Sequence, residues 1–300
     1  MRPFTGLLLA AAFCPAVAAQ TLVTLNPTQD SFVRDINPDS SFGTQDLWFG
    51  RGEFWGLGNI RTLVQFNLSG LPTDPLLVRS ARFSAYQYAT EQAAGGIDCE
   101  LHAVTAPWTE AIVTWNNQPG YDPRAWSRAE AGDIFHTGWV SWDATAIVRE
   151  QASGVFPNHG WLFRVQDESA GISRLGYFYS NNTAPNVNRL PRLDVETYEM
   201  RLDVTPLAGG QPATLSVTGA DPGRRVFFAR SLTGTGATFV PQLGVTLELG
   251  QPALIGSAFA DAAGAASLVV NVPAAGSGRH AWIQAAALGE LSNLNSQPIL

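Results

Sequence analysis

The sequence predicts an all-β protein with two consecutive β-sandwich domains. Short runs rich in Val, Phe, Tyr and Leu alternate between apolar and polar residues, and Gly, Pro, Asn or Asp bound them. No long segment has the period of about 3.6 residues that marks an amphipathic helix. Composition changes near residue 200, because only Trp282 of the nine tryptophans lies beyond it. We therefore expect a first domain over residues 20–200 and a small, Ala- and Gly-rich domain over residues 201–300.

Residues 1–19 are expected to be a secretory signal peptide. Arg2 supplies a positive charge, residues 4–13 form a short apolar run, and Ala-Val-Ala at 16–18 is a small-residue cleavage pattern. The run is too short to span a bilayer, and no later segment is apolar for long enough. Cys14 raises the alternative of a bacterial lipid anchor, but the bulky Phe13 before it favours free secretion. We expect a secreted, extracellular protein without a membrane span.

Charge and cysteine content limit the partners and the sources of stability. The formal net charge is −7, and all 18 basic residues are Arg. An acidic chain without a basic run argues against nucleic acid, whose phosphates require a cationic surface. An acidic polysaccharide would therefore have to meet locally placed Arg. Once the signal peptide is removed Cys99 is the only cysteine, so no intramolecular disulfide can form and the core must stabilise the chain.

Five strand-like runs follow one another along the first domain: residues 61–69, 79–88, 99–104, 160–166 and 191–200. In the second of them, alternation places two sets of side chains on opposite faces. These sets are Ala81, Phe83, Ala85 and Gln87 on one face and Arg82, Ser84, Tyr86 and Tyr88 on the other. One helix is expected over residues 142–154, capped by Asp143 or Thr145 and ended by Gly154.

The second domain repeats the strand pattern. Its runs are residues 211–220, 224–231, 243–250, 266–273 and 279–288. Asp-Ala-Ala-Gly at 261–264 indicates a tight turn. Strands at spacings of roughly ten residues suggest a small sandwich. It is similar to the compact β-domains that end many secreted bacterial proteins, but no motif assigns it to a family.

Five pieces of the first domain carry a family resemblance. They are QDSFVRDINPDSSFGTQDLWFG (29–50), RTLVQFNLSGLP (61–72), PWTEAIVTWNNQP (107–119), VSWDATAIV (140–148) and YSNNTAPNVNRLPRLDVETY (179–198). In this order they resemble the DNRLRE (disaggregatase-related) domain family, which is grouped with carbohydrate-binding modules. Asn67 stands where that family usually has Asp.

The resemblance covers residues 21–198 and implies a jelly-roll-like β-sandwich. It also implies binding of carbohydrate, including acidic polysaccharides such as alginate. The family takes its name from an enzyme that degrades a matrix polysaccharide, but these modules are usually appendages to catalysis. No catalytic domain is recognisable beside the module in this sequence.

The first candidate for glycan binding is an aromatic cluster in a Gly-rich stretch that reads as a loop. Its members are Trp48, Phe49, Phe54 and Trp55, with Arg51 and Glu53 beside them. Loops positioned by a rigid scaffold often carry binding residues. The alternative is a loop that packs on the end of the sandwich.

The second candidate is one face of the predicted sheet, lined by Arg82, Tyr86, Tyr88 and His102. Aromatic rings there could stack on sugar, and Arg could donate charge-assisted hydrogen bonds. The alternative is an ordinary half-exposed strand. Trp108 and Trp115 also permit two interpretations, sugar stacking or core packing, and core packing is favoured because Trp carries a large apolar area.

Calcium is the one cofactor that the sequence suggests. Asp30, Asp35 and Asp39, with Asp46 nearby, supply the hard oxygen ligands that Ca²⁺ prefers. Their spacing fits no EF-hand, and a solvated loop is the favoured alternative. Asp143 is a further possible ligand, but helix capping is the simpler explanation for it.

No catalytic motif is recognisable. The four His show no zinc spacing, and no Gly-x-Ser-x-Gly occurs. Glycoside hydrolysis needs two carboxylates at a set separation, and Glu100, Glu110, Asp143, Asp167 and Glu168 are available. The leading hypothesis is a secreted, non-catalytic polysaccharide-binding protein. A structural or adhesive extracellular protein and a polysaccharide-degrading enzyme are the alternatives.

Overall fold

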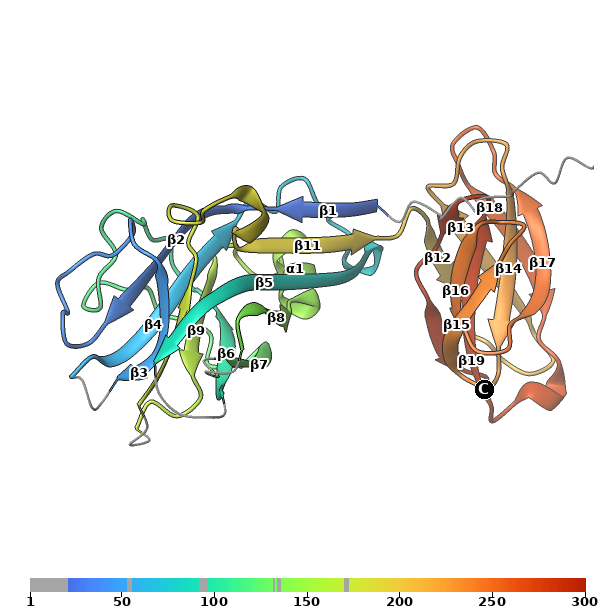
Figure 1. The fold of residues 1–300 in the computed structure, drawn as a ribbon. Helices are drawn as coiled ribbons and strands as arrows, with labels where there is room; N and C mark the ends of the chain where they lie inside the picture. The colour runs from blue at the N-terminus through green and yellow to red at the C-terminus, as the bar shows by residue number, and fades with distance from the viewer. Residues whose placement is uncertain (1–20, 53–55, 92–95, 132, 134–135, 170–172) are drawn as a thin grey trace, which may run out of the picture. The chain divides into compact units, whose positions relative to one another are not determined.

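The computed structural model describes residues 21–300 apart from 53–55, 92–95, 132, 134–135 and 170–172. The predicted signal peptide lies outside the described residues. The described chain divides into two compact units, residues 21–197 and 198–300 (Figure 1). None of the described helices is long and apolar enough to cross a membrane.

The first unit is built on a single antiparallel sheet of 11 strands. The strands are β1 (Thr21–Leu25), β2 (Pro27–Arg34), β3 (Leu47–Gly52), β4 (Gly58–Phe66), β5 (Val78–Glu91), β6 (Ile97–Ala103), β7 (Ser127–Ala131), β8 (Gly138–Asp143), β9 (Trp161–Val165), β10 (Arg174–Phe178) and β11 (Arg192–Thr197). Their order in the sheet is β1-β11-β5-β10-β3-β4-β9-β6-β7, with β2 paired to β4 and β8 paired to β5. Two 3₁₀ turns, η1 (Pro75–Leu77) and η2 (Val187–Arg189), and the helix α1 (Thr145–Ala152) lie in the connections.

The sheet curls so that strands distant in its order face each other across the core. The ring of Phe83 on β5 lies 4.8 Å from that of Phe163 on β9, although three strands separate β5 from β9 in the sheet. Trp142 and Trp161 complete this aromatic centre, with ring centroids 5.4 and 5.9 Å from Phe83. All four side chains are buried. The prediction of an all-β sandwich is therefore confirmed.

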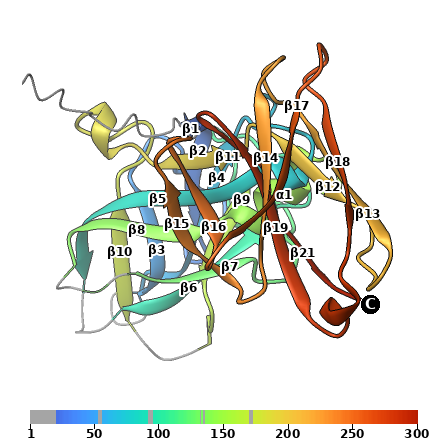
Figure 2. The same ribbon diagram turned by 90° about the vertical axis from the view of Figure 1, so that its right-hand side faces the viewer.

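The second unit consists of shorter sheets around its own core. Its strands are β12 (Arg201–Val204), β13 (Pro212–Thr218), β14 (Arg225–Ser231), β15 (Thr235–Val240), β16 (Val245–Leu249), β17 (Ala253–Phe259), β18 (Ala266–Asn271), β19 (His280–Ala287), β20 (Glu290–Leu291) and β21 (Asn295–Pro298), with the 3₁₀ turn η3 (Ala274–Gly276). One sheet has the order β12-β13-β18, and a second has the order β17-β14-β19-β20 with β21 on β19 (Figure 2). The hairpin β15-β16 forms a separate two-stranded sheet.

Local sequence signals account for the end of the helix and for one turn. The N-cap of helix α1 is Ala144, which makes no side-chain hydrogen bond, so the predicted cap at Asp143 or Thr145 is wrong. Asp143 lies one residue before the cap, and its carboxylate accepts from the backbone N–H of Thr145 over 2.9 Å. Gly154, with φ of 76°, follows the end of the helix, as expected for a left-handed C-terminal residue. In the predicted turn at 261–264, the Asp261 carboxylate accepts from the N–H groups of Ala263 and Ala265. All ten predicted strand runs fall on observed strands, and the strands that were not predicted are mostly the short ones.

Candidate functional site

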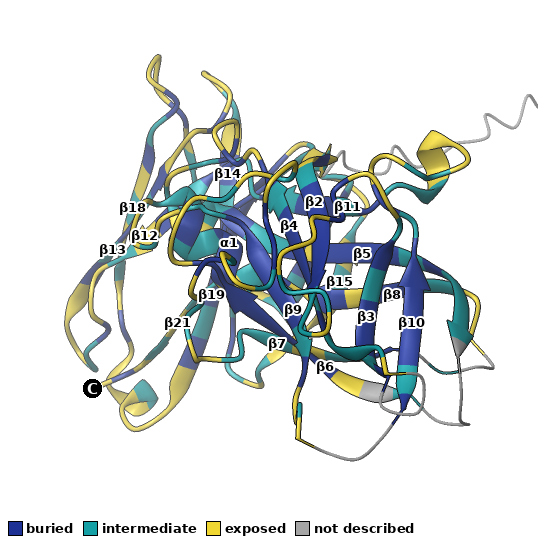
Figure 3. Ribbon diagram, turned by 90° about the vertical axis from the view of Figure 1, so that its left-hand side faces the viewer, coloured by how far each residue is buried: buried dark blue, intermediate teal, exposed yellow. Residues whose placement is uncertain are grey.

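Strand β5 carries the outward-facing side chains from which the candidate site is built. Phe83 and Ala85 point into the core, and Tyr86 and Tyr88 point to the opposite face. Arg82 is exposed, and the two tyrosines are half-buried. The predicted alternation along this strand is confirmed. In Figure 3, β5 and its neighbours β10 and β8 carry mainly buried and half-buried residues.

Four half-buried rings, Tyr86, Tyr88, Trp139 and Tyr179, form a continuous surface that we call the aromatic face. Trp139 lies on β8 opposite Tyr86, and their ring centroids are 5.4 Å apart, edge to face. Tyr179 follows β10, and its backbone N–H donates to the carbonyl of Tyr86 over 3.2 Å. Its ring stacks on Tyr88 at 4.5 Å. Strand pairing thus joins rings from three segments that are far apart in the sequence.

Two arginines lie over the aromatic face. The Arg189 guanidinium, in η2, is 4.8 Å from the ring centroid of Tyr86 and 5.9 Å from that of Tyr179. The Arg192 guanidinium, on β11, is 4.4 Å from the ring centroid of Trp139. Cation–π contacts of this kind contribute about 0.5–1 kcal/mol at exposed sites. They place positive charge beside a flat apolar surface, which suits a ligand with both sugar rings and acidic groups.

Arg82 lies farther along the same face, among polar side chains. It is paired in register with Asp143 on β8 and with Asp194 on β11. The next outward position of β5 is Ser84, whose hydroxyl is 2.8 Å from that of Ser141. The face therefore changes from aromatic to polar along β5, and both kinds of group are available to one extended ligand.

Trp48 continues the aromatic face through Tyr177. These two residues are register partners on β3 and β10, and their rings meet edge to face at 5.1 Å. Tyr177 in turn lies 6.3 Å from the ring of Tyr88. On its other side Trp48 stacks at 5.1 Å on the fully buried Phe32. The two candidate groups that were predicted separately, around Trp48 and around Tyr86, therefore belong to one sheet surface.

The prediction that Trp48, Phe49 and Arg51 lie in a loop is wrong, because they lie on β3. Phe49 is a buried core residue. Glycines are rare in strands, so the sequence of this stretch indicated a loop. One of them, Gly50, is nevertheless required by close packing between strands. Gly50 has φ of 129°, and a Cβ there would clash with the carbonyl oxygen of Arg174 on the neighbouring strand.

The remaining members of the predicted loop cluster are Arg51, Glu53, Phe54 and Trp55. Glu53, Phe54 and Trp55 lie outside the described residues. Arg51 donates to the side-chain oxygen of Asn59 over 3.1 Å and to the backbone carbonyl of Glu168. Its guanidinium therefore supports neighbouring backbone.

The structure also separates His102 from the aromatic face. Its strand, β6, is not a neighbour of β5 in the sheet, and the side chain is buried at 2% exposure. Its Nδ1 is 2.9 Å from the carbonyl oxygen of Asp122, and its Nε2 is 3.3 Å from the Glu100 carboxylate. The prediction that His102 shares a face with the β5 tyrosines fails because alternation does not reveal which strands are neighbours.

Trp108 and Trp115 pack against a second apolar cluster on the outer side of β4 and β9. The cluster consists of Val33, Leu63, Val104, Val113 and Leu162. The indole N–H of Trp108 donates to the carbonyl of His159 over 2.8 Å. The Arg61 guanidinium lies 4.6 Å from the ring centroid of Trp115. These contacts favour core packing over sugar stacking for both tryptophans.

Arg61 and Glu168 form a two-pronged ion pair beside Trp115. Both N–H···O distances are 2.7 Å, and each side chain is only 16% exposed. Burial alone would lower the pKa of Arg61, but the hydrogen bonds and charge of Glu168 raise it overall. Bidentate geometry of this kind is directional, so the pair ties the segment after β9 to strand β4.

The predicted calcium ligands engage separate partners. The Asp35 carboxylate accepts from the backbone N–H of Asn59 over 3.0 Å. The Asp39 carboxylate accepts from the side-chain amide of Asn116 over 2.8 Å. The Asp46 carboxylate accepts from the hydroxyl of Tyr88 on the aromatic face. Within the described ranges, no group of three or more His, Cys, Asp or Glu could hold a metal ion. Asp30, Asp35 and Asp39 are therefore not gathered into one site.

Asp30 is a fully buried carboxyl group on β2. One of its oxygens accepts from the backbone N–H of Asn181 over 2.8 Å, and the other has no hydrogen-bond partner. Burial raises the pKa of Asp30 to about 7, the nearby Glu110 charge adds to this rise, and the Asn181 hydrogen bond opposes it. This carboxyl is thus an unusually basic acid inside the first unit.

The carboxylates available for catalysis are mostly engaged in structural contacts. Glu100 pairs with Arg128 at 2.7 Å, and Glu110 accepts from the side-chain amide of Asn182 at 2.5 Å. One shallow polar pocket of about 300 Å³ does gather carboxylates, since Asp98, Glu130 and Asp167 line it with Arg174. Any hydrolytic activity would be sought there first.

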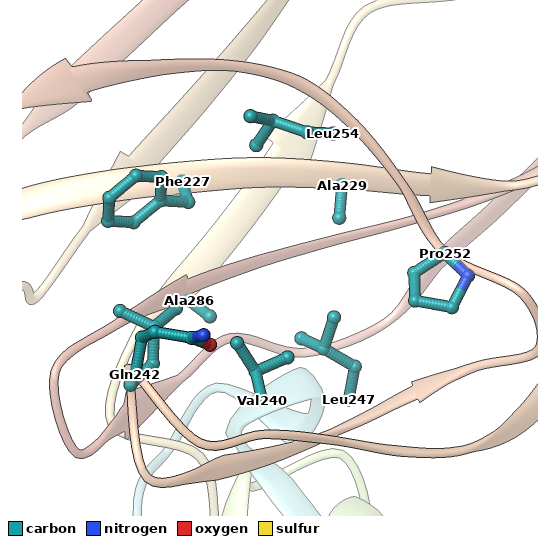
Figure 4. A pocket seen from close by; sticks show the side chains of 9 residues that line it. Phe227, Ala229, Val240, Gln242, Leu247, Pro252, Leu254 and Ala286 are labelled. Atoms are coloured by element: carbon teal, nitrogen blue, oxygen red, sulfur yellow. The ribbon is translucent and has the colours of Figure 1, made fainter.

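The second unit has an apolar pocket of about 300 Å³ beneath the β15-β16 hairpin (Figure 4). Phe227, Val240, Leu247 and Leu254 line it, and Gln242 supplies a polar side chain. A sugar carries hydroxyl groups that need hydrogen-bond partners when they are desolvated. This pocket therefore does not suit a glycan.

Sequence reasoning missed Trp139, Tyr179, Arg189 and Arg192. A signal for one of them exists, because alternation through Gly-Tyr-Phe-Tyr at 176–179 places Tyr177 and Tyr179 on one face. No local signal reports that β8 and β10 lie beside β5. The two arginines reach the face only because β11 pairs with β5.

Comparisons with known proteins address the first unit. The model of carbohydrate-binding module family 96 matches residues 21–190. No curated protein matches the chain. Among solved structures, the crystal structure of red sea bream transglutaminase is 10% identical, with a TM-score of 0.21. That match covers 91% of this chain and 31% of the other, and a TM-score this low does not indicate a shared fold.

The family match spans more than half of the chain and contains all four rings of the aromatic face. The chain belongs to carbohydrate-binding module family 96.

Proposed function

We propose that this protein is a secreted, non-catalytic polysaccharide-binding protein and that the aromatic face is its binding site. The observation that supports the site is the row of four half-buried rings with two guanidinium groups over it. Flat rings pack on the apolar faces of sugars, and Arg donates to hydroxyl and carboxylate oxygens. We also propose that the first unit is a DNRLRE-type domain, because five pieces of its sequence resemble that family.

The rings are preorganised for such a role. Each ring packs against a neighbouring ring, so little side-chain entropy is lost when a ligand binds. Arg189 and Arg192 already lie over Tyr86 and Trp139. A sugar that stacks on these rings would displace the guanidinium groups, which would then meet acidic groups of the same polysaccharide. We therefore expect acidic polysaccharides to bind more tightly than neutral ones.

The test is binding of the chain to a panel of neutral and acidic polysaccharides, measured with Trp139→Ala and Tyr86→Ala variants. Trp126→Ala is a matched control, because Trp126 is also half-buried beneath an arginine, with the Arg124 guanidinium 3.5 Å from its ring centroid, but packs against Phe156. We expect each face variant to weaken binding at least tenfold and the control to leave it unchanged. A Trp48/Trp55→Ala variant, measured in parallel, tests whether these two tryptophans contact the glycan.

The outcomes separate the three hypotheses. Binding that survives both face variants would place the site elsewhere. Failure of every glycan to bind would favour a structural or adhesive role. Release of sugar products, lost in Glu130→Gln, would favour a polysaccharide-degrading enzyme that uses the polar pocket near Asp98 and Asp167.

A further inference from the structure

A cavity of about 250 Å³ opens into the core of the second unit between its two larger sheets. Both sheets contribute to its wall, with Leu215 on β13 and Val270 on β18 from one sheet and Ile255 on β17 and Ile283 on β19 from the other. Leu215 and Ile283 are buried members of the core of this unit. The cavity is therefore an open end of the sandwich core rather than a shallow surface depression.

Two arginines, Arg230 and Arg279, line this mainly apolar cavity together with the polar Asn271. Arg230 lies on β14, where Val226 and Phe228 are buried in the core. Side chains alternate along a strand, so Arg230 shares the inward face with these two residues. Arg279 is exposed, just before β19. In the part of the chain that the structure describes, neither guanidinium has a hydrogen-bond or ion-pair partner.

An inward-facing guanidinium without a partner is unusual on a core strand. Arg230 is only half-buried, so its guanidinium lies at the open end of the cavity, where an anion from solvent can reach it. Two ion pairs of this unit, Arg201 with Asp203 and Arg224 with Asp221, join residues close in sequence and do not involve Arg230. A ligand that complements this site would therefore carry an anionic group attached to an apolar group.

We infer that the second unit binds a small amphipathic carboxylate, with its apolar chain in the cavity and its carboxylate between Arg230 and Arg279. The volume sets the size, because pockets for drug-sized ligands measure about 300–1,000 Å³ and this one is slightly smaller. A short acyl chain fits that limit. Planar guanidinium groups bind carboxylates bidentately, which selects the acid over its neutral analogues. This site is independent of the glycan site proposed for the first unit.

The test uses the full chain with octanoate as the probe and 1-octanol as its neutral counterpart. Two neighbouring residues of β17 report separate pockets in a methyl NMR titration. Ile255 lines the arginine-bearing cavity, and Leu254 lines the uncharged pocket of Figure 4. We expect octanoate to shift the Ile255 methyl signal and to bind at least tenfold more tightly than 1-octanol.

Arg230→Met removes the charge and keeps an apolar chain of similar length. Arg225→Met is the matched control, because Arg225 lies on the same strand but is exposed and donates to Ser257 over 3.0 Å. We expect the first variant to abolish the preference for octanoate and the control to retain it. Equal binding of acid and alcohol to the unaltered chain would overturn the inference. Shifts confined to Leu254, absence of binding, or an unchanged preference in folded Arg230→Met would also overturn it.

Discussion

Replacing Asp30 by Asn should remove a pH-dependent loss of stability from the first unit. The carboxyl group is fully buried, and only one of its oxygens has a hydrogen-bond partner. An Asn side chain has nearly the same shape. Its oxygen can still accept from the Asn181 N–H, and its amide takes the position of the unpartnered oxygen without a charge. The substitution therefore tests the cost of ionising this one group.

The magnitude follows from the raised pKa of Asp30. Burial raises it from 3.8 to about 7. Between these values the folded chain holds a proton that the unfolded chain has lost, so the free energy of unfolding falls as pH rises. The loss is complete above about pH 7, and it amounts to about 4 kcal/mol at 1.36 kcal/mol per pKa unit. Below pH 4 both states are protonated and the group contributes no pH dependence.

The assay is urea unfolding of the chain and of Asp30→Asn at a series of pH values from 4 to 8. Tryptophan fluorescence reports mainly the first unit, because only Trp282 lies in the second. We expect the variant to be more stable than the natural chain at pH 8, by up to about 4 kcal/mol, and the two to converge near pH 4.

A difference in stability that does not change with pH would refute the reasoning, as would a variant less stable than the natural chain at pH 8. The series is repeated with added Ca²⁺ and with a chelator. If Ca²⁺ stabilised the natural chain at pH 8 and not Asp30→Asn, the charge would be compensated by a cation, and the sequence-based calcium prediction would be supported at this residue.

Three further predictions concern stability and domain organisation. A fragment of residues 21–197 should fold without residues 198–300, because each unit encloses its own core, and circular dichroism should show a cooperative melt; an insoluble fragment would contradict two independent domains. Glu168→Gln should cost on the order of 2 kcal/mol in denaturant unfolding, because it leaves the Arg61 charge uncompensated in a site that is only 16% exposed, and a cost near zero would place the pair with ordinary surface ion pairs. Trp108→Phe should cost about 1–2 kcal/mol through the lost indole hydrogen bond and leave glycan binding unchanged, whereas weakened binding in the folded variant would restore its interpretation as a sugar-stacking residue.

The sequence by itself determined the features that depend on neighbouring residues along the chain. Alternation along β5 identified the inward set that includes Phe83 and the outward set that includes Tyr86, because successive side chains of a strand point to opposite faces. Gly154 marked the end of the helix, because a left-handed C-terminal glycine is also a local signal. The family signature at 107–119 was visible as well, although the sequence did not show that Trp108 and Trp115 cover the outer side of the sheet.

Only the tertiary structure decided which strands are neighbours, and the candidate site depends on that choice. Trp139 lies beside Tyr86 because β8 pairs with β5, and Arg192 reaches the face because β11 pairs with the other edge of β5. His102 was excluded for the same reason, since its strand pairs with β7 and β9. Strand pairing is a contact between segments distant in sequence, selected by the packing of the whole core. A local pattern therefore specifies which face a residue occupies but not which residues share that face.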